Sequence, residues 1–303
     1  MDFSNLPAGS SDSIKPFEIN IQPKVLNDLK DSIKLSAFAP LTYESSTADP
    51  KDLESFGISY EWLQKARDAW LTYDWKKSES YINTFPHFKA SIRHNVADFD
   101  VHFVGLFSER KNAIPIVYLH GWPVNAFPIQ VQPEGAPEIA SVPLNEQRGF
   151  ARAKHFVSQG WAYGIEHGTR PATIGFVLQS SPIALLSWIG EKFIAWTDET
   201  PQVDTILESV TLYWITHTIS RCLYPYREKY DPKDLSSPKP LGLSQFHKEI
   251  GLVPESWART RANVVFYRWH DEGGHFAALE KPELLLKDVE DFVSGLKDSG
   301  VLV

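Results

Sequence analysis

Residues 271–276 read Asp271-Glu272-Gly273-Gly274-His275-Phe276 and closely follow an apolar run, Val264-Val265-Phe266-Tyr267. The run has the length and the β-branched and aromatic content of a buried strand. A histidine on the loop after such a strand is positioned for acid–base chemistry, and two glycines let the backbone approach closely and leave the imidazole accessible. Glu249 lies in a loop before the strand, where a carboxylate can orient the imidazole. A loop histidine more often has only a structural role, so the assignment of His275 as a base depends on other motifs.

A second apolar run, Ile114–Leu119, leads into His120-Gly121-Trp122-Pro123. Its uninterrupted apolar character predicts a strand of the parallel kind, which is buried on both faces. Period-two patterns predict further strands at 17–21, 88–92 and 101–104, with a turn around Asn95–Asp98. A helical period predicts helices over 25–33 and from Asp52 to Trp75.

The second half of the chain is predicted to be mainly helical. After Pro123, several prolines and glycines indicate a loop of more than a dozen residues. Apolar periodicity then predicts helices over 145–160, 182–196, 204–223 and 282–296. A Pro/Ser/Lys-rich loop at 231–240 precedes the last strand, 264–267. The order of these elements predicts an α/β fold with a helical insertion.

Composition restricts the class of protein. The 303 residues are 43% hydrophobic and 22% charged, and the net charge of −8 comes without a basic cluster, which argues against nucleic acid or an anionic membrane as partner. No apolar run reaches the roughly 18 residues that span a bilayer, and the first 15 residues do not resemble a signal peptide. The single cysteine, Cys222, fits a reducing compartment and has no neighbours at metal-ligand spacing, so we expect a cytoplasmic protein without metal or cofactor. The aromatic content of 13% would suit an apolar small-molecule substrate where the rings cluster around a site, although most aromatic side chains simply fill the core and domain contacts.

Several motifs together resemble those of the microsomal-type epoxide hydrolases, including their soluble fungal members. The similarity covers nearly the whole chain, in the right order: residues 16–75, His120–Pro123, Tyr163 to Trp196 with Thr169-Arg170-Pro171 and Ser181-Pro182, Leu212-Tyr213-Trp214, Tyr226-Arg227-Glu228, and Gly273-Gly274-His275-Phe276-Ala277-Ala278-Leu279-Glu280. Each motif alone is a weak signal, whereas several in order are a strong one.

The resemblance implies an enzyme that hydrolyses a small apolar epoxide to a vicinal diol, in detoxification or secondary metabolism and without a cofactor. In that family an aspartate opens the epoxide and forms an ester, two lid tyrosines bind the epoxide oxygen, and a histidine–acid pair activates water. By position, Tyr163 and Tyr226 match the tyrosines, His275 the base and Glu249 the acid. His120, Gly121, Trp122 and Pro123 match the substrate loop, with the backbone of Trp122 as oxyanion donor. Read without the family, each tyrosine is more simply a buried hydroxyl with an ordinary partner.

The nucleophile does not follow where the family has it. In the family, the loop is followed by further strands and helices and then by Gly-Gly-Asp-x-Gly at a strand–turn–helix elbow. Here Pro123 is followed at once by a stretch that resembles the region after the elbow, and no aspartate occurs between Pro123 and Tyr163. Glu134, Glu138 and Glu146 lie in loop or helix-start contexts. About three strand–helix units, on the order of 90 residues, are absent relative to the family.

We therefore expect an α/β-hydrolase-type core that is truncated in its central sheet. Residues 1–110 form an N-terminal extension of the epoxide hydrolase type, 111–124 and 240–303 form the core, and 125–239 form a helical lid region. Three functions remain open: hydrolysis of an epoxide, a non-catalytic remnant that binds apolar ligands or self-associates, and acid–base opening of an epoxide without a covalent intermediate. Self-association into a homo-oligomer follows if removal of the central units leaves an apolar edge uncovered.

Overall fold

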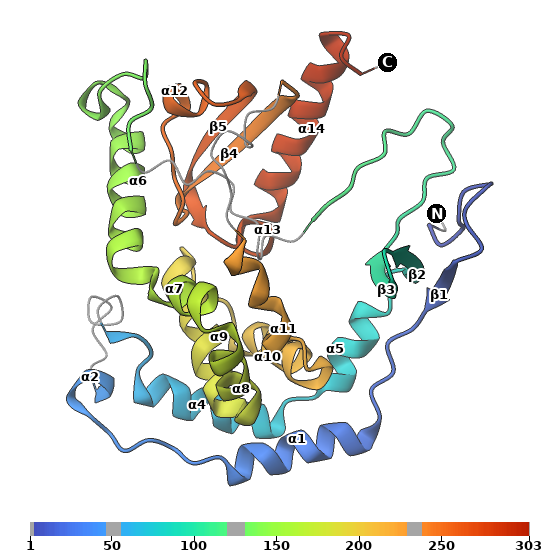
Figure 1. The fold of residues 1–303 in the computed structure, drawn as a ribbon, viewed down its shortest axis with the longest axis vertical. Coiled ribbons are helices and arrows are strands. Elements are labelled where there is room, and N and C mark those ends of the chain that lie inside the picture. The colour runs from blue at the N-terminus through green and yellow to red at the C-terminus, as the bar shows by residue number, and fades with distance from the viewer. Residues whose placement is uncertain (1–2, 47–55, 120–130, 229–237, 303) are drawn as a thin grey trace. The chain divides into compact units, whose positions relative to one another are not determined.

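The computed structural model describes residues 3–46, 56–119, 131–228 and 238–302. The chain forms two compact units, one of residues 1–31 and 72–120 and the other of residues 32–71 and 121–303. Figure 1 shows the helices and strands of each unit along the chain. Helix α1 (Pro23–Leu35) begins in the first unit and ends in the second.

The first unit is built on a three-stranded antiparallel sheet in the order β1-β2-β3. Strand β1 (Ile14–Phe17) pairs with β2 (His87–His94), and β2 forms a hairpin with β3 (Ala97–Val104). Asn95 occupies the hairpin turn with a φ of 54°, a left-handed conformation that asparagine tolerates. Phe88 and Phe103 are register partners and their rings stack at 5.5 Å, which holds the hairpin together on one face. The predicted strands 88–92 and 101–104 and their turn are confirmed.

A buried carboxylate joins helix α5 (Trp75–Ile82) to the segment that follows β1. Glu79 accepts hydrogen bonds from the backbone N–H of Ile21 at 2.8 Å and from Trp75 Nε1 at 3.1 Å. Lys76 Nζ lies 2.5 Å from the other carboxylate oxygen. Burial alone raises the pKa of Glu79, but these donors outweigh it and lower that pKa overall. Both oxygens of the carboxylate therefore have hydrogen-bond partners, and Glu79 takes the place of a backbone acceptor for the N-terminal segment.

The apolar run Ile114–Leu119 does not form the predicted buried strand. Residues 105–119 contain neither helix nor strand, and Ile116, Val117, Tyr118 and Leu119 are 63%, 84%, 72% and 73% exposed. A strand of the parallel kind needs a neighbour on each side to pair its backbone and layers on both faces to cover its side chains. Among the described residues, no strand pairs with this run. The prediction was wrong because burial of such a strand depends on its neighbours in the sheet and not on its own apolar sequence alone.

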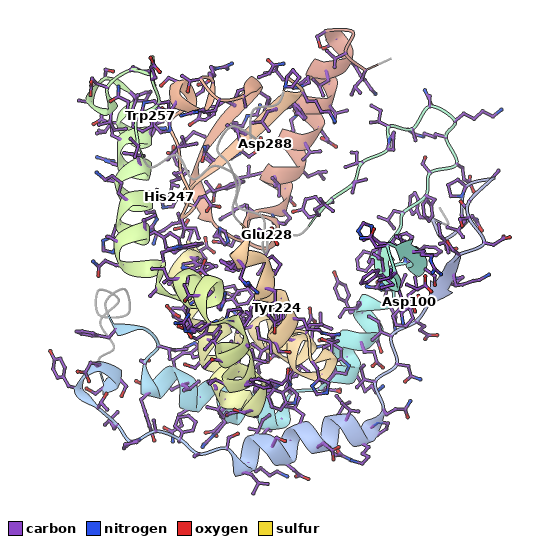
Figure 2. The ribbon with its side chains drawn as sticks, in the orientation of Figure 1. Asp100, Tyr224, Glu228, His247, Trp257 and Asp288 are labelled. Atoms are coloured by element: carbon purple, nitrogen blue, oxygen red, sulfur yellow. The ribbon has the colours of Figure 1, made fainter. Side chains whose placement is uncertain are left out.

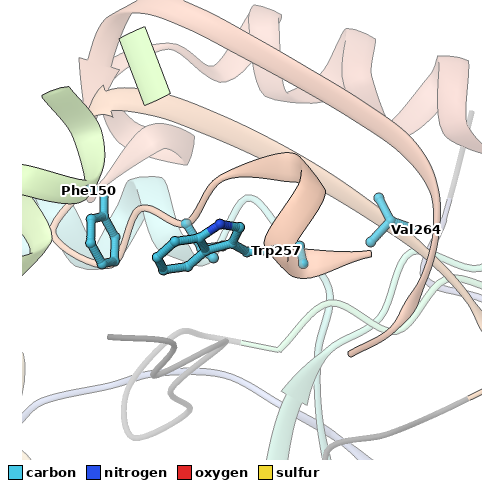
Figure 3. Packing of buried hydrophobic residues seen from close by; sticks show 5 residues of the cluster. Phe150, Trp257 and Val264 are labelled. Atoms are coloured by element: carbon cyan, nitrogen blue, oxygen red, sulfur yellow. The ribbon is translucent and has the colours of Figure 1, made fainter. Parts of the chain in front are cut away.

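The second unit contains a parallel pair of strands, β4 (Pro240–Lys248) and β5 (Asn263–Gly274). Helix α6 (Leu144–His155) lies on one side of the pair and α14 (Pro282–Asp298) on the other (Figure 1). Phe150 of α6, Trp257 of α12 (Glu255–Ala258) and Val264 of β5 form a buried cluster at 2–7% exposure (Figure 3). The predicted last strand is confirmed but is longer than expected. Strand β4 was missed, because its glycine and polar residues hide its period.

Ion pairs fasten α14 to β5. Asp288, labelled in Figure 2, lies on α14 and is only 2% exposed. It accepts from His270 Nε2 at 2.7 Å and from Arg268 Nη1 at 2.7 Å. Arg268 Nη1 also lies 3.0 Å from Asp291, one turn further along the helix. Because two strand residues share one buried carboxylate, the rotation of α14 about its axis is set as well as its position.

A group of helices makes up the rest of the second unit. After α6 comes a π-helical turn (Phe156–Gly160), and then α7 (Ala162–Thr169), α8 (Pro171–Ser180), α9 (Pro182–Trp196), α10 (Val203–Thr216), α11 (Ile219–Cys222) and a 3₁₀ turn (Tyr224–Arg227). Helix α9 begins as predicted, with Ser181 accepting from the N–H of Ala184 and Pro182 at the first position. The predicted helix 204–223 is broken at His217, whose φ of 51° ends α10 in a left-handed cap.

The N-terminal helices of this unit pack on the helical group. Trp70, in α4 (Tyr60–Thr72), is 1% exposed, and its Nε1 donates to the hydroxyl of Thr211 in α10 at 2.8 Å. A Cβ on Gly190 of α9 would lie 2.5 Å from the ring of Trp62, so glycine is required where α4 crosses α9. Short helix α2 (Tyr43–Ser46) precedes α4. Within the described ranges no single helix is long and apolar enough to cross a bilayer, although α8 and α9 together, bent by 112°, meet that length and composition.

Candidate active site

The end of β5 presents His275 through a turn that needs its two glycines. Gly273 has a φ of +85°, which residues with a Cβ rarely adopt. A Cβ on Gly274 would lie 2.4 Å from the carbonyl oxygen of Trp196 and 3.0 Å from the carboxylate of Glu280. The next residue, His275, donates its backbone N–H to the same Trp196 carbonyl at 2.9 Å. The expected close approach of the backbone at these glycines is confirmed, and it brings the loop against the end of α9.

Two carboxylates hold this loop in place. Glu280, at the end of α13 (Ala277–Glu280), accepts from the N–H of Asp198 at 2.6 Å and from the N–H of Gly274 at 3.1 Å. Asp198 in turn accepts from the N–H of Gly273 at 3.0 Å and lies 3.5 Å from His247 Nε2. The loop that carries His275 is therefore cross-connected to the residues that follow α9.

Glu249 and His275 form a direct pair. His275 Nδ1 lies 2.9 Å from Oε1 and 3.1 Å from Oε2 of Glu249, and the Glu249 carboxylate also accepts from the N–H groups of Ile250 at 2.6 Å and Gly251 at 3.1 Å. Burial raises the pKa of Glu249, but the hydrogen bond and charge of His275, with the two backbone donors, lower it overall. Since the carboxylate engages Nδ1, exchange of a proton with water runs through Nε2.

The two predicted lid tyrosines lie next to each other. Tyr163, in α7, is 6% exposed, and its ring centroid lies 6.0 Å from that of Tyr226, in the 3₁₀ turn after α11. The two hydroxyls share a hydrogen bond. Burial raises the pKa of both phenols well above the ordinary value, so both stay protonated and able to donate.

Trp196 connects the two pairs. Its ring centroid lies 5.1 Å from that of His275 and 5.5 Å from that of Tyr163. Sequence reasoning did not single out Trp196, nor the clamping residues Asp198 and Glu280. The signal that could have found them is position: Trp196 ends the most apolar helix, Asp198 follows it, and Glu280 closes the motif that begins at Gly273.

A small cavity lies beside the tyrosines. Its volume is about 30 Å³, enough for a water molecule, and its walls include His167, Lys192, Tyr213 and Cys222. Burial, and then the charge of Lys192, lower the pKa of His167 to about 4. Burial raises the pKa of Cys222 to about 11, so this cysteine is a thiol at neutral pH and a poor nucleophile.

The remaining predicted residues divide into two groups. His120, Gly121, Trp122 and Pro123 lie outside the described residues. Glu146 is buried in α6 at 6% exposure, and burial, the largest cause, raises its pKa above the ordinary value. Among the residues that the structure describes, no group of three or more His, Cys, Asp or Glu side chains is arranged to hold a metal ion.

Comparison with known proteins gives one consistent family. Residues 14–128 match the family model described as the epoxide hydrolase N terminus. A putative epoxide hydrolase of Dothistroma septosporum is 32% identical over 401 residues, covering 99% of this chain and 95% of the relative. Epoxide hydrolase 1 of Sus scrofa is 23% identical over 424 residues, with 96% and 91% coverage. Both alignments are longer than the 303 residues of this chain, so each contains positions that the chain does not have.

Solved structures agree with the sequence relatives. The epoxide hydrolase of Aspergillus niger superposes with a TM-score of 0.88 at 35% identity, over 97% of this chain and 99% of that one. The juvenile hormone epoxide hydrolase of Bombyx mori superposes with a TM-score of 0.72 at 21% identity, with 94% coverage of each chain. The fold is thus an α/β-hydrolase-type core with a small sheet, a helical lid and an N-terminal extension, as expected. The chain belongs to the epoxide hydrolase family.

Proposed function

We propose that this chain binds a small apolar epoxide and hydrolyses it to a vicinal diol by direct attack of water, at a rate far below that of a family member with a nucleophile. The observation that supports this most strongly is the arrangement around Trp196. On one side is the His275–Glu249 pair and on the other the Tyr163–Tyr226 pair. A base and two oxygen donors are the groups that opening of an epoxide by water requires.

The proposed reaction uses each group once. Tyr163 and Tyr226 donate hydrogen bonds to the epoxide oxygen, which becomes an alkoxide as its bond to carbon breaks. His275 accepts a proton from water through Nε2 while the water oxygen bonds to that carbon, and Glu249 stabilises the imidazolium. The alkoxide takes a proton from a tyrosine, and the proton held by His275 returns to the phenolate through solvent. Atoms and charges balance without a second reactant.

The absence of a nucleophile is the reason for proposing direct attack. The Gly-Gly-Asp-x-Gly elbow that the resemblance implies has no counterpart between Pro123 and Tyr163. The extra length of the alignments with relatives supports a missing internal segment. Cys222 is an unsuitable replacement, because burial keeps its thiol protonated. Glu146 lies buried within helix α6 and not on a strand–turn–helix elbow.

The test is hydrolysis of an aryl epoxide by the full chain and three variants. His275→Gln and Glu249→Gln should abolish the residual rate above background, and Tyr163→Phe should lower it by about tenfold or more. His155→Gln, an exposed histidine at the end of α6, is the matched control and should leave the rate unchanged. A wild-type rate in His275→Gln would refute the proposal.

A second candidate is a non-catalytic protein that self-associates. The exposure of Ile116–Leu119 favours it, because a contiguous apolar run in solvent is an interaction site or an aggregation hazard. A second copy is the proposed occupant, which would make the assembly a homo-oligomer. Sedimentation of the chain and of Val117→Lys separates the two candidates: a concentration-dependent oligomer that the variant dissolves supports self-association, and a monomer contradicts it.

The domain organisation, the class of partner and the location in the cell are also proposals. We infer that residues 1–110 act as the N-terminal extension, 111–124 with 240–303 as the hydrolase core, and 125–239 as the lid. The net charge of −8 supports a protein that does not bind nucleic acid, and the single cysteine supports a cytoplasmic location. Fractionation of the source cells would test the location.

A further inference from the structure

Lys192 is a buried cation that the proposed reaction does not use. It lies in α9 and is only 7% exposed, although lysine is almost never buried without a specific partner. Trp188 and Trp196 lie one helical turn before and after it, and therefore on the same face of α9. This face is directed toward α7, which carries Tyr163.

Three aromatic rings surround the ammonium group. Lys192 Nζ lies 4.9 Å from the ring centroid of Tyr163, 5.2 Å from that of Trp188 and 5.7 Å from that of Trp196. All three distances are within the range of cation–π attraction, which is stronger when the cation is desolvated. The carboxylate of Glu191 is its ion-pair partner. The cage holds a positive charge close to one of the two tyrosines that face the site.

The titratable groups that face Tyr163 come from four elements. On α9 are Glu191 and Lys192, on its own helix is His167, in the 3₁₀ turn is Tyr226, and after β4 is Glu249. The two carboxylates make ionisation of the phenol harder, and His167 is neutral at pH 7 since its pKa is about 4. Lys192 supplies the positive charge that opposes the two carboxylates.

We propose that Lys192 is a positioning residue that makes the hydroxyl of Tyr163 a stronger proton donor. This rests on the proposed function, in which Tyr163 donates to the epoxide oxygen. As the alkoxide forms, the Tyr163 O–H bond breaks, the proton bonds to the alkoxide oxygen, and the electron pair stays on the phenol oxygen. A fixed ammonium beside the ring lowers the free energy of that phenolate without contacting the substrate. The cage around Nζ keeps the charge in one place, so it does not reorganise during the transfer.

The test measures the acidity of residue 163 directly and needs no substrate. A fluorinated tyrosine that ionises near neutral pH replaces Tyr163 in the full chain, and its pKa is read from the pH dependence of its fluorine resonance. Lys192→Met should raise that pKa by on the order of one unit, because it removes the nearby positive charge. Lys192→Arg should leave it within about 0.3 unit, and Glu191→Gln should lower it, since the removed charge has the opposite sign.

The controls separate electrostatics from folding. Lys192→Gln replaces Lys192→Met if the latter does not fold, and circular dichroism confirms the helical content of each variant. An unchanged pKa in folded Lys192→Met or Lys192→Gln overturns the inference, and so does an equal rise in Lys192→Arg. The titration is independent of turnover: if the chain hydrolyses no epoxide but the pKa shifts as stated, the proposed function fails and the effect of Lys192 on Tyr163 stands.

Discussion

The turn at the end of β5 follows an apolar strand, and the stretch 105–119 contains an apolar run. The two regions differ in how the hydrogen-bonding groups of their backbones are paired. Around His275, the N–H groups of Gly273, Gly274 and His275 each donate to an acceptor on Asp198, Glu280 or Trp196. In the other stretch, Ile116–Leu119 are 63–84% exposed and belong to neither helix nor strand.

The contrast shows that an apolar run acquires its structure from its neighbours. Strand β5 has a parallel partner in β4 and a helix on each side, whereas Ile114–Leu119 lacks the strands that a complete sheet would place beside it. The residues proposed for acid–base chemistry and oxygen binding belong to the well-packed region.

The largest expected effect, on the rate of epoxide hydrolysis, comes from supplying the strands that would lie beside Ile114–Leu119. Insertion, between Pro123 and Val124, of a segment with the Gly-Gly-Asp-x-Gly elbow that the resemblance implies should raise epoxide hydrolysis by on the order of 10⁴-fold or more, because a nucleophile and its partners act as a unit. The same insertion with its elbow aspartate changed to alanine is the control and should restore burial of Ile116–Leu119 without the rate. Steady-state kinetics and the solvent accessibility of Tyr118 report the two effects. No gain in rate from the intact insertion would contradict the account.

Gly274 tests the tight turn itself. Gly274→Ala places a Cβ 2.4 Å from a backbone carbonyl that cannot move away freely, and should lower the free energy of unfolding by about 3 kcal/mol. Gly295→Ala, in α14, is the matched control, since no atom lies within 4 Å of the place its Cβ would take and alanine favours helix; it should raise stability by about 0.5–1 kcal/mol. Chemical denaturation measures both. Equal effects of the two substitutions would mean that the turn is not constrained as described.

His167 should make stability fall in mild acid. Its pKa is lowered from 6.5 to about 4 in the folded chain, so as the pH falls through 6.5 the unfolded chain takes up a proton that the folded chain does not. Unfolding is therefore favoured, by about 2 kcal/mol between pH 7 and pH 5, and the loss levels off below about pH 4. His167→Asn should remove that part of the pH dependence. An identical slope in the variant would contradict the assignment.

The smallest effect is expected in the uncovered stretch. Val117→Lys changes a side chain that is 84% exposed and should alter the free energy of unfolding by less than about 0.5 kcal/mol, while it lowers aggregation. Leu186→Ala, at a site with no exposure, should cost about 2–5 kcal/mol. Thermal denaturation with light scattering separates stability from aggregation. A large loss of stability in Val117→Lys would show that the stretch is packed after all.

Local patterns predicted the elements whose signals are local. The β2–β3 hairpin and helices α1, α9 and α14 follow from their periods and caps. Strand β4 was missed because glycine and polar residues interrupt its pattern. The buried strand predicted for Ile114–Leu119 was wrong. Such a strand depends on other strands that pair with it and on layers that cover it, and its own sequence gives no information about either.

The sequence predicted those residues of the candidate site that belong to recognisable motifs. Residues of recognisable motifs, His275, Glu249, Tyr163 and Tyr226, come together in two pairs, and their catalytic roles stay predictions. Lys192 could not be selected from sequence, because a lysine in an apolar helix gives no sign of what it faces until α7 is packed against α9.

The most direct test of direct water attack is a single turnover of an aryl epoxide in water enriched in heavy oxygen, with enzyme in excess. If His275 activates water without a covalent ester, the first diol formed carries heavy oxygen from the solvent. If a carboxylate of the protein attacks first, the first diol carries ordinary oxygen and the heavy isotope enters the protein. We expect slow formation of a labelled diol. Rapid formation of an unlabelled diol in the first turnover would contradict it and would mean that a carboxylate of this chain acts as the nucleophile.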